Sequence, residues 1–167
     1  METSLKLREG ETFVLLLRHG IAEKKGIKPD AERELTPEGH ERMERIGRTI
    51  ARIFPDAMAL YTSPLVRCRQ TADWVVQAFG DSLEAVTTDA LLPEARAGDF
   101  RRLMSANPAR YFICVGHEPN LSTIASAVTG LGDGLELKKG GVYGIRFTPE
   151  NATLEWLLPP SLLARGL

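Results

Sequence analysis

The segment that most constrains the fold is a run of five apolar residues, 13–17, followed directly by Arg18, His19 and Gly20. A short run that is apolar at every position predicts a strand buried on both faces, as in the centre of a parallel sheet. The end of such a strand places a guanidinium and an imidazole where open α/β sheets bind their ligands. Gly20 is expected to let the backbone turn sharply and approach a ligand closely. The segment therefore predicts an α/β sheet with a site at its carboxyl edge.

Strand and helix patterns alternate along the rest of the chain. Further strands are expected over residues 57–61, 84–88, 110–115, 142–147 and 153–158, and helices over 37–54, 65–79, 97–106 and 119–129. Alternation of this kind predicts a three-layer α/β/α sandwich with a mostly parallel central sheet.

Local signals mark where two of these helices begin. Thr36 followed by Pro37 is a hydroxyl N-cap with proline at the first helical position. We expect Ser63 to cap the next helix in the same way. Residues 21–35 are polar and predict a loop, and the polar residues 1–10 are expected to fray.

Length and charge exclude several classes of protein. The chain has 167 residues and a formal net charge of −1, so we expect residues 1–167 to form one domain without a general affinity for nucleic acid. No apolar segment reaches about 18 residues, the length of a membrane-spanning helix. Residues 1–6 lack the basic start and apolar stretch of a signal peptide. We therefore expect a cytoplasmic protein with neither a nucleic-acid nor a membrane partner.

The cysteines and histidines do not form a metal-binding pattern. Cys68 and Cys114 are expected to be free thiols in a reducing compartment, because two cysteines do not make a disulfide framework. The three histidines and two cysteines have no metal-ligand spacing. We therefore expect the protein to use neither a metal nor a cofactor.

Cationic side chains follow three of the predicted strands. Arg18 and His19 end the first strand, Arg67 lies in the first turn of the helix after the second, and His117 follows the fourth. If these ends meet, two guanidiniums and two imidazoles require an anion. Arg67 offers the fork geometry that suits a phosphate, and the start of its helix offers free N–H groups. The sequence thus predicts a site for a phosphoryl group.

Three blocks of sequence carry a family resemblance. They are residues 17–22 (Leu-Arg-His-Gly-Ile-Ala), 62–72 (Thr-Ser-Pro-Leu-Val-Arg-Cys-Arg-Gln-Thr-Ala) and 115–122 (Val-Gly-His-Glu-Pro-Asn-Leu-Ser). In this order they resemble the signature blocks of the histidine phosphatase superfamily, and the compact length and third block resemble its SixA-type phosphohistidine phosphatases most. The resemblance implies a phosphoglycerate-mutase-like fold and a metal-independent phosphatase that works through a phosphohistidine intermediate.

The resemblance also assigns roles to individual residues. His19 would be the nucleophile, Arg18 and Arg67 would bind the phosphoryl oxygens, and His117 would complete the phosphate pocket. Glu94 lies in the loop where many members of the superfamily carry a general acid, and it is our candidate for that role. The alternative is that Glu94 is an exposed loop residue, since the SixA-type branch often has no obvious acid there.

The resemblance also bears on the substrate class, because mutases and sugar-bisphosphate phosphatases of the superfamily carry long insertions that close over a small substrate. Only about twenty residues separate the third and fourth predicted strands, so no long insertion closes over the site. An open pocket suits a phosphorylated side chain of another protein, such as phosphohistidine on a histidine phosphotransfer domain. The alternatives are a phosphatase of a small phosphate ester, such as a nucleotide or sugar phosphate, and a non-catalytic phosphoprotein-binding module. The intact set of Arg18, His19, Arg67 and His117 argues against the last.

Overall fold

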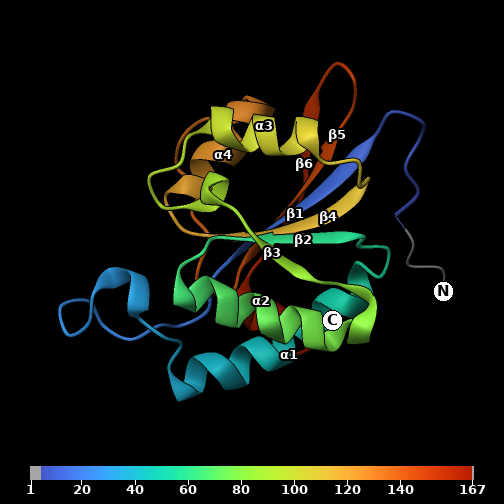
Figure 1. Ribbon diagram of the computed structural model, residues 1–167. Helices are drawn as coiled ribbons and strands as arrows, with labels where there is room; N and C mark the ends of the chain where they lie inside the picture. Colours follow the sequence, from blue (N-terminus) through green and yellow to red (C-terminus); the bar gives the residue numbers. More distant parts are fainter. Residues whose placement is uncertain (1–4, 167) are drawn as a thin grey trace.

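A six-stranded sheet forms the centre of the protein (Figure 1). The computed structural model describes residues 5–166, except for the side chain of Asp81. The strands are β1 (Thr12–Arg18), β2 (Ala59–Thr62), β3 (Ala85–Thr87), β4 (Tyr111–Gly116), β5 (Val142–Phe147) and β6 (Ala152–Leu158). Their order across the sheet is β3-β2-β4-β1-β5-β6. The first four strands in this order run parallel, while β5 pairs antiparallel with both β1 and β6. The predicted mostly parallel sheet is confirmed.

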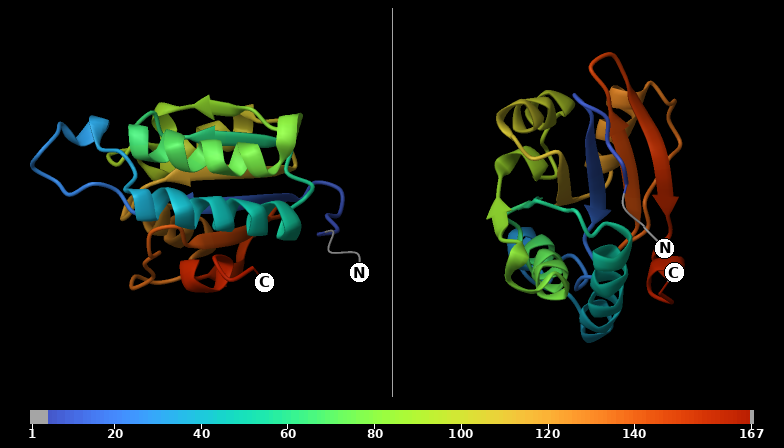
Figure 2. Two further views of the ribbon diagram at one scale, coloured as in Figure 1. Left: turned by 90° about the horizontal axis from the view of Figure 1, so that it is seen from below. Right: turned by 90° about the vertical axis from the view of Figure 1, so that its right-hand side faces the viewer.

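Helices cover both faces of this sheet (Figures 1 and 2). They are α1 (Pro37–Ile53), α2 (Val66–Ala78), α3 (Ala97–Ala106), α4 (Asn120–Thr129) and the short α5 (Pro160–Leu163). The helices α1, α2 and α5 bury their apolar sides on one face, and α3 and α4 bury theirs on the other. The predicted three-layer arrangement is therefore confirmed.

The central strand β1 is held from both sides because its side chains alternate between two cores. Leu15 and Leu17 share one core with Ile46 of α1, whereas Leu16 shares the other with Ile124 of α4. All of these side chains are fully buried, and each such burial contributes roughly 1.5–3 kcal/mol. The packing fixes the end of β1, where Arg18 and His19 lie.

The two predicted helix starts have different outcomes. Thr36 Oγ1 accepts a hydrogen bond from Gly39 N at 3.0 Å, and Pro37 is the first helical residue, so this cap is confirmed. The predicted cap at Ser63 is wrong, because α2 has Leu65 at its N-cap position with no side-chain cap. Pro64 keeps the residue before it extended, so the helix starts later.

Residues 5–10, part of the segment for which we expect fraying, contact the rest of the protein at several points; residues 1–4 lie outside the described part. Leu5 and Leu7 pack against the core beneath α1 and α2. The hydroxyl of Tyr111 donates to the carbonyl of Leu5 at 2.6 Å. Arg110 donates to the carbonyls of Arg8 and Glu11. A polar composition therefore did not prevent this segment from docking.

The two cysteines are free and buried, as expected. Burial raises the pKa of Cys68 to about 12 and raises that of Cys114 further, which makes both thiols unreactive at neutral pH. Within residues 5–166, no helix has the length and apolar character needed to cross a bilayer.

Candidate active site

Two histidines meet at the carboxyl edge of the sheet because the strands that carry them are neighbours. The parallel strands β1 and β4 pair with Arg18 opposite Gly116. His19, one residue further, donates its backbone N–H to the carbonyl of Gly116 at 3.0 Å. His117 follows Gly116, and the centroids of the two imidazole rings lie 5.3 Å apart in an edge-to-face arrangement.

The third strand end brings Arg67 to the same place. Ser63 follows β2 and donates its backbone N–H to the carbonyl of Val115 in β4 at 3.0 Å. Arg67 lies in the first turn of α2, and its Nη2 is 3.3 Å from His117 Nδ1. The structure therefore brings Arg18, His19, Arg67 and His117 together, and we call these four residues the floor.

The ring of His19 is held in one orientation by the backbone carbonyl of the next residue, Gly20. Its Nδ1 lies 2.7 Å from the carbonyl oxygen of Gly20, which can only accept, so Nδ1 carries the proton. The lone pair of the neutral ring is therefore on Nε2. Gly20 itself does not have a positive φ, and a Cβ there would lie 2.6 Å from Met43 Cγ. Close packing against α1, rather than the expected sharp turn, explains the glycine.

His117 has the opposite tautomer, and it is held by Ser63. Arg67 is only a donor, so His117 Nδ1 accepts from it and Nε2 carries the proton. That Nε2 lies 2.8 Å from the hydroxyl oxygen of Ser63, which is fully buried. The serine expected to cap a helix instead orients a site histidine, and its position directly after a strand was the only sequence signal for this.

Burial keeps both imidazoles neutral. The side chains of His19 and His117 are 6% and 2% exposed. Desolvation is the largest cause that lowers the pKa of each ring to about 3; His117, Arg67 and Arg18 add to it at His19, and Arg67 adds to it at His117. The arginines thus favour the neutral form, as expected, but burial contributes more.

Two buried arginine nitrogens on the floor have no hydrogen-bond acceptor. Arg18 donates through Nη1 to the carbonyl of Leu137 at 2.5 Å, yet its Nε is buried and unpaired, and so is Nε of Arg67. An unsatisfied buried donor costs about 1–3 kcal/mol, and more when charged. Both arginines also border the cavity, so an oxyanion bound there would lie beside two positive charges.

A cavity of about 650 Å³ opens above the floor, and basic side chains surround it. They come from the loop that follows His19 and from the turn before β5, and we call them the rim: Lys24, Lys25, Lys28, Arg33 and Lys139. Sequence reasoning predicted the loop but gave these residues no role. The pair of adjacent lysines shortly after the Arg-His-Gly triplet was the signal available.

Asp30 links this loop to the floor. Arg67 donates through Nη1 to the carbonyl of Asp30 at 2.7 Å and forms an ion pair with its carboxylate at 3.2 Å. Arg33 holds the other carboxylate oxygen at 2.9 Å. Desolvation acts to raise the pKa of Asp30, but the hydrogen bond of Arg33 and the charges of both arginines outweigh it and lower the pKa. Asp30 is therefore ionised, and both of its carboxylate oxygens are paired with arginines.

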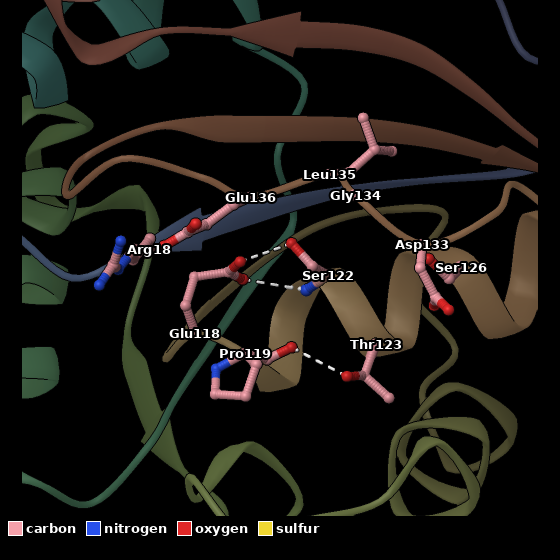
Figure 3. A pocket seen from close by; sticks show the side chains of 10 residues that line it. All are labelled: Arg18, Glu118, Pro119, Ser122, Thr123, Ser126, Asp133, Gly134, Leu135 and Glu136. Carbon is pink, nitrogen blue, oxygen red and sulfur yellow. Dashed lines mark hydrogen bonds between the residues drawn. The ribbon is translucent and has the colours of Figure 1, made fainter.

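Glu118 and Arg18 line both this cavity and a second one, of about 430 Å³, and Figure 3 shows the second cavity. The carboxylate of Glu118 accepts from the backbone N–H of Ser122 at 2.9 Å, from its hydroxyl, and from Leu137 N at 3.3 Å. The same Leu137 accepts from Arg18. Glu118 thus braces the segment that holds Arg18, a contact the sequence did not reveal.

Glu94 lies apart from the floor. It lines a separate surface hollow with Asp99 and Arg102, whereas its neighbour Pro93 borders the cavity with His19. The structure therefore does not bring our candidate general acid together with the other four predicted residues.

The geometry can be compared with proteins of known sequence and structure. An uncharacterized protein of Picosynechococcus sp. is 31% identical over 135 residues, which cover 77% of this chain and 81% of that protein. The protein histidine phosphatase SixA, complexed with tungstate, matches with a TM-score of 0.80 at 17% identity over 90% of this chain and 98% of that one. Phosphoglycerate mutase from Bacillus anthracis matches with a TM-score of 0.73 at 14% identity over 94% and 97%. The phosphoglycerate-mutase-like fold is thereby confirmed.

The family assignment comes from the sequence itself. Residues 14–112, more than half of the chain, match the sequence model of the histidine phosphatase superfamily, branch 1. This range contains α1, β2, α2 and all but the first two residues of β1, and with them Arg18, His19 and Arg67. The chain therefore belongs to branch 1 of the histidine phosphatase superfamily.

Proposed function

We propose that the protein is a phosphatase that removes the phosphoryl group from phosphohistidine on a signalling or phosphotransfer protein, with His19 as the nucleophile. Membership of the histidine phosphatase superfamily supports a phosphatase. The observation that carries the proposal is an oriented, neutral His19 that borders the same cavity as the guanidinium groups of Arg18 and Arg67.

In this mechanism His19 Nε2 attacks phosphorus and the bond from phosphorus to the leaving group breaks. Arg18 and Arg67 bind the phosphoryl oxygens, so most of the catalytic effect comes from positioning and charge stabilisation. Water then attacks the phosphorus of the phosphohistidine, which releases inorganic phosphate and restores neutral His19. A phosphate dianion near His117 would raise the pKa of that imidazole, because an opposite charge favours the cation.

The supply of protons favours phosphohistidine over an ester. The carboxylates that border the cavity are Glu23, Asp30 and Glu118. Each is already engaged: Glu23 with Lys28 and the backbone of Glu34, Asp30 with two arginines, and Glu118 with Ser122 and Leu137. The leaving imidazole of phosphohistidine is protonated on its own ring nitrogen, so it needs no carboxylic acid from the enzyme.

Trapping of the intermediate tests the proposal. The wild type, mixed with a radiolabelled phosphohistidine phosphotransfer domain in the presence of chelator, should acquire label that is stable in alkali and lost in acid. His19→Ala should acquire none and release no phosphate. His40→Gln is the matched control, because the third histidine bonds Trp74 and does not border the cavity. Label on His19→Ala would refute the nucleophile, and turnover of small phosphate esters alone would refute the substrate class.

A further inference from the structure

The loop between β1 and α1 forms a closed arm beside the cavity. We define the arm as residues 23–34; an antiparallel bridge between Ala22 and Leu35 closes its base. Glu23 N donates to the carbonyl of Glu34 at 2.8 Å, and Lys28 forms ion pairs with both glutamates at 3.1 and 2.9 Å. The arm therefore has a defined shape although it carries only one short 3₁₀ turn, Asp30–Glu32.

The arm projects away from the rest of the protein (Figures 1 and 2, blue). Ile27, near its tip, is 84% exposed and borders neither core nor cavity. A small phosphate ester bound on the floor lies inside the cavity, which Gly26 and Lys28 also border, whereas Ile27 between them does not line it. Only a larger molecule can therefore contact the floor and the side chain of Ile27 at the same time.

The charge of the arm is concentrated where the cavity opens. Lys24 and Lys25 are exposed, border the cavity, and have no ion-pair partner among residues 5–166. Lys139 across the opening is exposed and equally unpaired within that range. The whole chain has a net charge of −1, so this is a local basic surface and not part of a generally basic protein.

The neighbouring cavity has the opposite character. Beyond Glu118 it is bordered by the exposed carboxylates of Asp133 and Glu136 (Figure 3). A negatively charged partner is attracted on the side of the arm and repelled on this side. The site is therefore electrostatically asymmetric, which fixes how a charged partner approaches.

We propose that the arm is a docking element for an acidic protein surface that lies beside the phosphorylated side chain, with Lys24 and Lys25 as its charged contacts and Ile27 as its apolar contact. This inference rests on the proposed function and adds the chemistry of the partner. Asp30 ties the arm directly to Arg67, so a partner seated on the arm is aligned with the floor.

Two synthetic phosphohistidine peptides of equal length test the inference, one flanked by glutamates and one by lysines. The wild type should prefer the acidic peptide by about tenfold or more in kcat/KM at low ionic strength. This preference should shrink as salt shortens the Debye length from about 30 Å at 0.01 M to about 3 Å at 1 M. Lys24→Glu/Lys25→Glu should abolish or reverse the preference.

The matched control is Arg45→Glu/Arg48→Glu, which makes the same change in charge at two exposed positions of α1 that do not border the cavity. It should keep the wild-type preference. Turnover of an aryl phosphate by both variants reports that they are folded.

The outcomes separate the two proposals. If the wild type hydrolyses both peptides without preference, or if Lys24→Glu/Lys25→Glu leaves the preference unchanged, the docking inference is overturned and the phosphatase proposal stands. If Lys24→Glu/Lys25→Glu slows both peptides and the aryl phosphate equally, the lysines act on the phosphoryl group and not on the surface beside it, and the inference is also overturned. If the wild type hydrolyses the aryl phosphate but neither peptide, the proposed function fails.

Discussion

The floor of the cavity consists of side chains that strand ends and buried hydrogen bonds hold in place, whereas the rim lies on connecting segments and, apart from the buried Arg33, consists of exposed side chains. On the floor, His19, Arg67 and His117 are at most 6% exposed. On the rim, Lys24 and Lys25 are exposed and have no ion-pair partner among the described residues. The side chains of the floor are therefore restricted in orientation, whereas Lys24 and Lys25 on the rim can reorient.

This difference suggests a division of labour. Buried groups with restricted orientation are suited to chemistry, because they need no reorganisation when charge develops. Exposed charges contribute little to folding stability, but they steer a charged partner during association. We therefore expect changes on the floor to affect every substrate and changes on the rim to affect only some.

The largest expected effect is the pH dependence of stability that the buried neutral floor imposes. His19 and His117 have folded-state pKa values of about 3, against about 6.5 in an unfolded chain. Between these values the unfolded state binds more protons, so stability is complete above pH 6.5 and falls as pH decreases towards 3. From pH 7 to 5 the two rings together should cost about 4 kcal/mol.

Urea unfolding at a series of pH values measures this loss. His117→Asn removes one of the two rings and should roughly halve the dependence on pH between 7 and 5. A free energy of unfolding that is constant across that range would mean that the folded rings protonate normally, and the contrast between floor and rim would disappear.

Arg67→Lys should have the next largest effect, because a lysine keeps the charge but loses the fork that holds Asp30 and His117. We expect kcat/KM to fall about 100-fold for an aryl phosphate and for phosphohistidine alike. Arg69→Lys is the matched control, since Arg69 is exposed on the same helix and does not border the cavity. A loss confined to one substrate would mean that Arg67 acts in substrate selection, as we expect of the rim, and not in the chemistry common to all substrates.

Ser63→Ala should have a smaller effect that still reaches every substrate. It leaves His117 Nε2–H with only the weak acceptor Cys68 Sγ at 3.4 Å, which costs about 1–3 kcal/mol, and it loosens the hold on the ring. We expect kcat to fall about tenfold, with a shifted pH–rate profile that a merely structural change would not produce. An unchanged profile in a variant of unchanged stability would mean that Ser63 does not position the ring.

Glu94→Gln should have the smallest effect, because Glu94 lines a separate hollow. We expect a change of less than about threefold in kcat on an aryl phosphate and on phosphohistidine, well below the effect of losing a general acid, about 10²–10⁴-fold. The pH–rate profile on the aryl phosphate is the decisive measurement. Loss of its alkaline limb in the variant would restore Glu94 as the general acid.

The sequence predicted the floor better than the rim for a physical reason. Arg18, His19 and His117 follow buried apolar strands, and adjacent parallel strands necessarily bring their ends together. The helices Ala97–Ala106 and Asn120–Thr129 begin and end close to their predicted positions because local signals set them. Local sequence pattern is therefore sufficient to predict that Arg18, His19 and His117 lie at one edge of the sheet.

The remaining features depend on contacts between distant segments, which local pattern does not contain. The side chain of Ser63 turns to His117, 54 positions away, instead of capping α2. The arm is anchored beside the cavity because Asp30 bonds Arg67, 37 positions away. Glu94 is adjacent in sequence to a residue that borders the cavity, yet its own side chain lies elsewhere.

The bridge between Ala22 and Leu35 has a consequence for how such proteins diversify. It closes the arm at its base, and the exposed residues 24–29 within the arm belong to neither hydrophobic core. Substitutions there leave the folding of the sheet intact, so mutation and selection can rewrite them at little risk to the enzyme. Proteins that keep the same site residues can thus come to bind different partner proteins through changes in a single surface segment.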